Sequence, residues 1–239
     1  HSSITKSNWS SSWAERRLGS LPTGQPVSFV SPEEPVRSSP LDTLIVRKKE
    51  QTTFNTGWPA GRVEKLPIVG ADGRTNVAGL FICGDLAGVP LLKFALDSGV
   101  RAVRAIKEGL GAPQRAQDRT PDLIILGAGV AGMAAAVEAR RLGLDFEVLE
   151  ASEAFSTLVN FPKGKPIFTY PEAMKPQGEL QVSATVKEAL IEELRDQVAR
   201  AGINPRPARA ELIERQGEVL QVHLQDGGSL RARAVLVAI

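Results

Sequence analysis

The stretch from residue 122 to residue 150 constrains the fold of this 239-residue chain more than any other part of it. A run of large aliphatic residues at 123–126 is typical of a buried strand, and the segment Gly-Ala-Gly-Val-Ala-Gly at 127–132 follows at once. A helix rich in alanine is expected over 130–142, and a second strand over 146–150. Strand, glycines, helix and strand within about 30 residues predict a βαβ unit of an α/β domain with a parallel sheet.

The glycines of this unit have separate physical roles. Gly127 permits the tight turn, Gly129 lets the backbone approach a pyrophosphate, and Gly132 allows close packing between helix and strand. Free N–H groups and the helix dipole favour phosphate at the helix start. Glu150, at the end of the second strand, would accept hydrogen bonds from ribose hydroxyls and repel a 2′-phosphate. This unit therefore predicts FAD or NAD rather than NADP, and it does not separate the first two.

A second motif precedes the first in the chain. Residues 75–85 read Thr-Asn-Val-Ala-Gly-Leu-Phe-Ile-Cys-Gly-Asp, which resembles the second FAD signature of the pyridine nucleotide–disulfide oxidoreductase superfamily. The resemblance implies that a strand delivers Asp85 to the ribityl hydroxyls of FAD. It also implies that the helix starting near residues 89–90 points its N-terminus at the flavin, where the dipole stabilises negative charge on the ring. This motif favours FAD over NAD.

The resemblance covers about residues 60–239 and is nearest to thioredoxin reductase-like proteins, bacillithiol-disulfide-reductase-like flavoproteins in particular. The sequences Val-Asn-Phe-Pro at 159–162 and Thr-Tyr-Pro at 169–171 are also similar to that subgroup. The predicted cofactor-binding residues are Gly84, Asp85, Gly127, Ala128, Gly129, Val130, Ala131, Gly132, Glu150 and Ala151. No acid, base or nucleophile can be named from the sequence.

The two motifs stand in the reverse of the family's order, in which the glycine-rich unit comes first and the Gly-Asp signature last. Either the chain joins the end of one flavoprotein unit to the start of another, or it is one circularly permuted FAD domain. We favour permutation. Residues 234–239 resemble the strand that leads into the family's NAD(P)H domain, and no second dinucleotide fingerprint follows. The resemblance thus implies an FAD domain whose NAD(P)H domain is absent from this sequence.

The expected fold is a Rossmann-like FAD/NAD(P)-binding three-layer domain, with a central parallel sheet and a small antiparallel β-meander. Residues 1–60, rich in Ser and Pro, are expected to form an extended or loosely ordered arm, with a short strand over 41–47. The C-terminal-type half of the FAD domain is assigned to 61–110, a linker to 111–120 and the N-terminal-type half to 121–239.

Further elements are expected on both sides of the fingerprint. The other expected strands are 63–69, 79–84, 209–214, 219–225 and 229–238. The other expected helices are 91–110 and 185–201. Pro90 suits the first turn of the earlier helix, and Thr185 and Glu188 stand at capping-box spacing at the start of the later one.

Composition excludes several kinds of site. The single Cys excludes an internal disulfide framework and a CxxC redox pair, and with only two His it makes a metal site improbable. The 29 basic and 27 acidic residues nearly balance, so nothing indicates nucleic-acid binding. No apolar run is long enough to span a membrane, and a cytoplasmic protein is expected.

Four conspicuous polar or thiol side chains are expected to be structural or solvated. Cys83 falls at a small-residue position of the flavin signature and is interpreted as a packed core thiol. Alternation places His223 on the solvent face of its strand. Lys163 and Lys165 are assigned to a solvated loop, in a segment that approaches the cofactor in the family.

These observations predict the FAD-binding domain of an NAD(P)H-dependent flavoprotein oxidoreductase, which passes electrons from nicotinamide through flavin to an unknown acceptor. NAD(P)H is the expected co-substrate, and a homodimer is left open. The alternative is a regulatory or scaffold module that binds FAD or NAD without turnover. A third reading, an NAD-dependent dehydrogenase, leaves the Gly-Asp signature unexplained.

Overall fold

The computed structural model describes residues 43–45, 68–88, 90–111 and 120–239. All of these residues belong to one compact unit. The predicted arm at 1–60 lies outside the described residues except for strand β1 (Thr43–Ile45), which is the short strand expected there. Most of the predicted linker at 111–120 also lies outside them.

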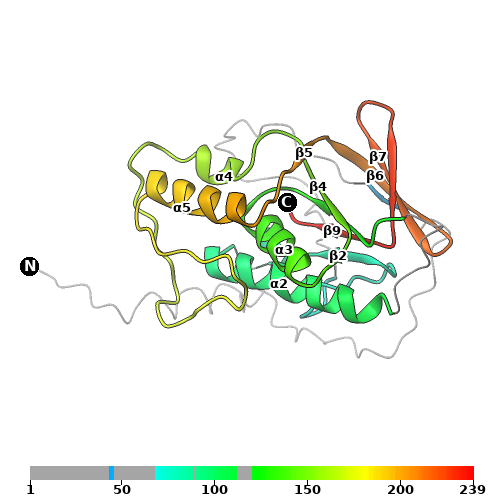
Figure 1. Ribbon diagram of the computed structural model, residues 1–239, viewed down its shortest axis with the longest axis horizontal. Coiled ribbons are helices and arrows are strands. Elements are labelled where there is room, and N and C mark those ends of the chain that lie inside the picture. The colour runs from blue at the N-terminus through cyan, green and yellow to red at the C-terminus, as the bar shows by residue number, and fades with distance from the viewer. Residues whose placement is uncertain (1–42, 46–67, 89, 112–119) are drawn as a thin grey trace, which may run out of the picture. The chain divides into compact units, whose positions relative to one another are not determined.

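A five-stranded parallel sheet forms the centre of this unit (Figure 1). Its strands, in spatial order, are β2 (Leu80–Ile82), β9 (Ala234–Val237), β3 (Leu123–Leu126), β4 (Phe146–Glu150) and β5 (Arg206–Pro207). Each strand pairs with its neighbours in parallel. The last strand of the chain, β9, thus lies between β2 and β3. One sheet therefore unites the segment that carries the Gly-Asp motif with the segment that carries the glycine-rich motif.

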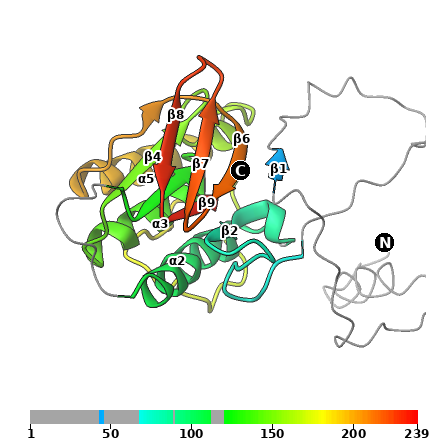
Figure 2. The ribbon, with the colours of Figure 1, turned by 90° about the vertical axis from the view of Figure 1, so that its right-hand side faces the viewer.

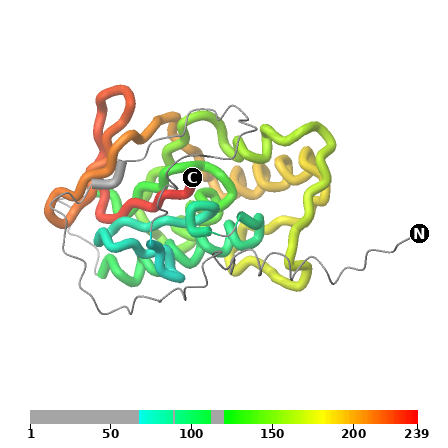
Figure 3. The backbone as a smooth tube through the Cα atoms, turned by 180° about the vertical axis from the view of Figure 1, so that it is seen from behind, coloured from blue at the N-terminus to red at the C-terminus, as the bar shows by residue number. Residues whose placement is uncertain are grey.

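Helices cover one face of this sheet. The helical elements are η1 (Gly84–Ala87, a 3₁₀ turn), α2 (Leu92–Gly109), α3 (Val130–Arg141), α4 (Ser156–Val159) and α5 (Lys187–Arg200). Helices α2 and α3 lie together in Figures 1 and 3 and pack very closely. A Cβ on Gly99 of α2 would lie 2.2 Å from the carbonyl oxygen of Ala131 in α3. Only glycine allows the two backbones to approach this closely.

An antiparallel sheet covers the other face (Figure 2). It contains β6 (Ala210–Gln216), β7 (Val219–Leu224) and β8 (Ser229–Ala232), in the order β1-β6-β7-β8. Ile213 and Val222 from this sheet share one buried cluster with Ile124 and Val235 from the parallel sheet. Helices, parallel sheet and meander therefore form the three layers that the sequence predicted, and the fold class is confirmed.

One predicted strand is in fact two. The stretch 229–238 was expected to be continuous, but it divides at Arg233 into β8 and β9, which belong to different sheets. The guanidinium of Arg233 donates to Asp122 Oδ1 at 2.9 Å and to the carbonyl of Leu110, and its backbone N–H donates to Pro121 O at 3.0 Å. These contacts hold the chain where it crosses between the two sheets.

The capping box predicted at Thr185 and Glu188 was wrong. Helix α5 begins at Lys187 after Val186, without a side-chain cap, and the Glu188 carboxylate accepts the backbone N–H of Gly164 at 3.0 Å. The carbonyl of Thr185 accepts the N–H of Ile167 at 2.8 Å. Contacts with residues 164–167 thus replace the local cap.

The strand expected over 63–69 was also wrong in its described part. Residues 68 and 69 are not in a strand, and 63–67 lie outside the described residues. Across the described ranges, no helix is long and apolar enough to cross a bilayer.

Candidate functional site

The carboxyl ends of the parallel strands converge on one pocket. The ladder runs slightly beyond the strands, with hydrogen bonds from Cys83 N to Val237 O (2.9 Å) and from Ala238 N to Leu126 O (2.8 Å). The chain then turns away at this edge, where a pocket of about 590 Å³ opens. Ligands of open α/β sheets bind at such an edge, and the volume is typical of small-molecule sites.

Two glycines of the fingerprint are required by the fold itself. Gly127 has φ +105°, and a Cβ there would lie 2.5 Å from Ala238 O. A Cβ on Gly132 would lie 1.9 Å from Gly127 O. Any side chain at either position would displace backbone, so these glycines permit the turn and the close packing of α3 on the loop.

Gly129 is different, because its surroundings in the described structure do not require a glycine. Its φ is −72°, and apart from its chain neighbours no atom of the described residues lies within 4 Å of a Cβ built on it. Gly129 lines the pocket, so a side chain there would enter space that is open to a ligand. The missing side chain therefore serves the pocket rather than the fold.

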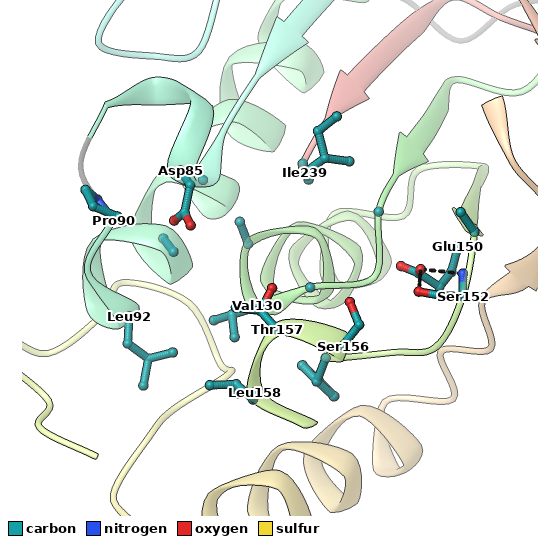
Figure 4. A pocket seen from close by; sticks show the side chains of 18 of the residues that line it. Asp85, Pro90, Leu92, Val130, Glu150, Ser152, Ser156, Thr157, Leu158 and Ile239 are labelled. Atoms are coloured by element: carbon teal, nitrogen blue, oxygen red, sulfur yellow. Dashed lines mark hydrogen bonds between the residues drawn. The ribbon is translucent and has the colours of Figure 1, made fainter. Parts of the chain in front are cut away.

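The N-terminus of α3 lies at the middle of the pocket, where Figure 4 shows Val130. The first N–H groups of a helix have no intrahelical partner, and the helix dipole gives this end a partial positive charge. An anionic group that approached Gly129 would meet these donors. The local structure thus suits a phosphate or pyrophosphate.

The Glu150 carboxylate is held in place at one end of the pocket. Its Oε2 accepts the backbone N–H of Ala128 at 2.7 Å, and its Oε1 accepts the N–H and hydroxyl of Ser152 at 2.8 and 3.0 Å. The N–H of Ala128 is therefore directed at Glu150 rather than at the pocket. A carboxylate fixed in this way can accept further hydrogen bonds from hydroxyl groups of a ligand.

The Gly-Asp motif lies at the other end of the same pocket. Gly84 has φ +77°, and its N–H donates to Ser98 Oγ at 3.0 Å. Asp85 follows it in η1 and is exposed at the pocket rim. Figure 4 shows Asp85 on the opposite side of the α3 N-terminus from Glu150. The two motifs therefore delimit one elongated site.

Helix α2 also opens onto this end. It begins at Leu92 after Leu91, so Pro90 precedes the helix instead of occupying its first turn as predicted. Pro90, Leu91 and Leu92 all line the pocket. The positive end of the α2 dipole therefore lies beside the pocket, near Asp85.

Most of the predicted cofactor-binding residues line this pocket. Ala128 and Gly132 do not, and both lie buried behind it. The lining residues of that set are Gly84, Asp85, Gly127, Gly129, Val130, Ala131, Glu150 and Ala151.

Several other lining residues were missed by the sequence analysis. Ser152, which holds Glu150, could have been found from its position two residues after the acid. Phe155 is buried in the left-handed region (φ 59°), and its N–H donates to Ala128 O at 2.9 Å, which no sequence pattern indicates. Arg209 lines the pocket between β5 and β6.

The side chains expected to be structural or solvated have varied environments. Cys83 is 1% exposed, and burial raises the pKa of its thiol to about 12. Cys83 is thus a packed core thiol, as predicted. His223 Nε2 lies 3.0 Å from Glu214 Oε2, on the side of β7 away from the core. Lys165 is exposed but lines the pocket, with its Nζ 3.6 Å from the Phe161 ring centroid, whereas Lys163 is simply exposed.

Among the described residues, no group of three or more His, Cys, Asp or Glu could hold a metal ion.

Comparison with known proteins bears on the cofactor. Residues 122–237 match the family model described as FAD binding domain. No curated protein gives a significant match. The match over 122–237 contains the whole glycine-rich unit and Glu150.

Three solved structures are similar to part of this chain. A bacillithiol disulfide reductase from Staphylococcus aureus is 16% identical, with a TM-score of 0.44 over 50% of this chain and 38% of its own. A flavin-containing monooxygenase from Stenotrophomonas maltophilia is 22% identical, with a TM-score of 0.43 over 49% and 38%. A thioredoxin reductase from Gloeobacter violaceus is 24% identical, with a TM-score of 0.36 over 49% and 34%. The chain thus spans less than two fifths of each of these proteins.

The family match agrees with the predicted resemblance to FAD-dependent oxidoreductases and with the predicted cofactor. The three-layer fold and the glycine-rich loop at the pocket are what such a domain requires. The match over residues 122–237 thus supports FAD as the cofactor of this chain.

Proposed function

We propose that FAD lies along the elongated pocket and that the chain is the FAD-binding part of an NAD(P)H-dependent oxidoreductase. The observation that carries this proposal is that two motifs far apart in the sequence line one pocket. A nucleotide that needed only the glycine-rich unit would not require the Gly-Asp motif at the other end.

The proposed orientation follows from the charges and donors of the site. Glu150 holds the adenosine ribose, and the α3 N-terminus beside Gly129 binds the pyrophosphate. Asp85 accepts hydrogen bonds from the ribityl chain. The α2 N-terminus lies beside the flavin, where its dipole stabilises negative charge.

Bound FAD supplies the redox chemistry, as an acceptor of hydride and a donor of electrons. The protein would bind and orient it. Cys83 is buried with a raised pKa and does not line the pocket. It is therefore unsuited to act as a nucleophile, and the acceptor is not reduced through a thiol of this chain.

We further propose that the motif order reflects circular permutation of a single domain. The position of β9 between β2 and β3 supports this, because both halves then contribute to one sheet. A junction of two units is the alternative. Permutation predicts one FAD per chain in a monomer, whereas a junction predicts that the motifs pair between chains in an obligate assembly. Measuring mass in solution together with FAD stoichiometry distinguishes them.

The test of the proposed function is anaerobic reduction. The purified chain is reconstituted with FAD, then NADH or NADPH is added, with dithionite as the control that the flavin is reducible. Bleaching by a nicotinamide supports an oxidoreductase. A bound flavin that only dithionite bleaches supports the alternative, a module that binds the nucleotide without turnover. We also propose that NAD(P)H is the electron donor and that the protein is cytoplasmic.

A further inference from the structure

One row of residues on α2 holds a remote loop segment. Lys93, Asp97, Val100 and Arg104 are spaced by three or four residues and therefore share one helix face. We call them the α2 row. Each contacts the segment 171–178, which lies far along the chain and runs beside α2 in Figures 1 and 3.

Lys93 makes the contact closest to the pocket. Its side chain is buried, and its Nζ donates to Pro171 O at 2.8 Å and to Glu172 O at 3.2 Å. No ion pair is formed by Lys93 within the described part of the chain. A buried ammonium costs free energy unless it is hydrogen-bonded, so these two carbonyls are its necessary partners.

The rest of the row holds the end of the same segment. Asp97 Oδ1 accepts the N–H of Gln177 at 3.2 Å, and Arg104 Nη1 donates to Gln177 Oε1 at 2.8 Å. A Cβ on Gly178 would lie 2.5 Å from Val100 Cγ2. Polar and apolar contacts therefore fix this segment along three turns of α2.

The residues just before this segment form a wall of the pocket. Pro166, Ile167 and Phe168 line it, as do Leu92 and Ala95, which flank Lys93 on α2. Ile167 is held from the other side, because its N–H donates to Thr185 O at 2.8 Å. The wall is thus anchored at both ends, by residue 185 and by the α2 row.

We infer that Lys93 is a positioning residue, which sets the wall at the flavin end of the pocket without touching the cofactor. This inference rests on the proposed orientation of FAD. Glu150 lies at the other end of the pocket, and Gly129, at the α3 N-terminus, lies near its middle. Loosening the wall should therefore weaken the binding of FAD more than the binding of ADP, because ADP has no flavin and does not reach the wall.

The test compares Lys93→Met with Lys107→Met in the full chain. Met keeps the length of the side chain but removes the donor. Lys107 is an exposed lysine on the same helix and serves as the matched control. Equilibrium titrations measure FAD and ADP affinities, and hydrogen–deuterium exchange without ligand measures protection of residues 166–178.

We expect Lys93→Met to raise the Kd for FAD by about tenfold or more, which corresponds to about 1.4 kcal/mol, and to leave the Kd for ADP within about twofold. Exchange in 166–178 should become faster, while Lys107→Met should match wild type. Equal losses of FAD and ADP affinity, or unchanged FAD affinity, would overturn the inference.

Gln177→Ala is the second variant, in case Lys93→Met does not fold. It removes only the exposed side chain that Arg104 holds. Gln177→Ala should speed hydrogen–deuterium exchange in residues 166–178 and weaken the binding of FAD but not of ADP, by less than Lys93→Met does. Unchanged exchange would count against the inference. A wild-type chain that binds neither FAD nor ADP would refute the proposed function instead, while exchange in the variants would still test the anchoring.

Discussion

Gly129 and Gly132 should respond to alanine in opposite ways. The two glycines lie three residues apart. A Cβ on Gly132 would lie 1.9 Å from Gly127 O, whereas one on Gly129 would meet no atom within 4 Å among the residues that the structure describes. Gly129→Ala should therefore impair the ligand site and spare the fold. Gly132→Ala should damage the fold.

The magnitudes follow from these positions. Overpacking against rigid backbone lowers the free energy of unfolding by up to about 3 kcal/mol. The better helix propensity of alanine raises it by about 1 kcal/mol. Gly132→Ala should lose about 2 kcal/mol, which lowers Tm by about 4–8 °C in a chain of this size. At Gly129 the poorer capping by alanine and the reduced entropy of the unfolded chain nearly cancel, so Tm should shift by about 2 °C at most.

Thermal unfolding and FAD titration check both variants. Gly129→Ala should fold normally and bind FAD at least about tenfold more weakly, since its methyl group enters the space assigned to pyrophosphate. Gly129→Ala with wild-type affinity for FAD would show that the phosphates lie elsewhere. Gly132→Ala with wild-type stability would refute the close packing of α3 on the loop.

Three further predictions concern other residues. Glu150→Gln, which keeps the shape but loses the charge that the Ser152 hydroxyl and two backbone N–H groups hold, should weaken FAD severalfold in the same titration and leave Tm nearly unchanged. Cys83 should resist alkylation at pH 8 in the folded protein and react fully in denaturant, because burial raises the pKa of its thiol to about 12; rapid labelling of folded protein would contradict this. Hydrogen bonds from Arg141 and Arg104 lower the pKa of the buried Glu138 carboxyl in the folded protein. Ionised Glu138 therefore stabilises the fold fully above its pKa in the unfolded chain, about 4.3, and this stabilisation is lost as the pH falls through its lower pKa in the folded protein. Glu138→Gln should cost about 1.5–3 kcal/mol at pH 7 in denaturant unfolding, and the gap from wild type should narrow below about pH 4.

The sequence could predict what local patterns encode. The strand–glycine–helix–strand unit predicted the local structure, with a turn at Gly127, a helix starting after Gly129 and a strand ending at Glu150, because each feature depends on one short segment. The alternation of β7 placed His223 away from the core for a similar reason.

What depends on distant partners could not be predicted. The helical pattern over 91–110 does not reveal that Lys93 is buried, because its partner Pro171 lies 78 residues later in the chain. Thr185 and Glu188 have the spacing of a capping box, but they do not bond to each other's backbone. Instead, Thr185 O accepts the N–H of Ile167, and the Glu188 carboxylate accepts the N–H of Gly164. The division at Arg233 depends on Asp122 and Leu110, which no periodicity within 229–238 can reveal.

Binding of FAD and ADP by two single variants, one substituted at each end of the pocket, tests the central claim most directly. FAD and ADP affinities are measured for wild type, Glu150→Gln and Asp85→Ala. If one FAD spans both motifs, wild type binds one FAD per chain. Glu150→Gln then weakens the binding of both FAD and ADP, and Asp85→Ala weakens the binding of FAD alone. Undiminished FAD affinity in Asp85→Ala, or no FAD binding by folded wild type, would contradict it.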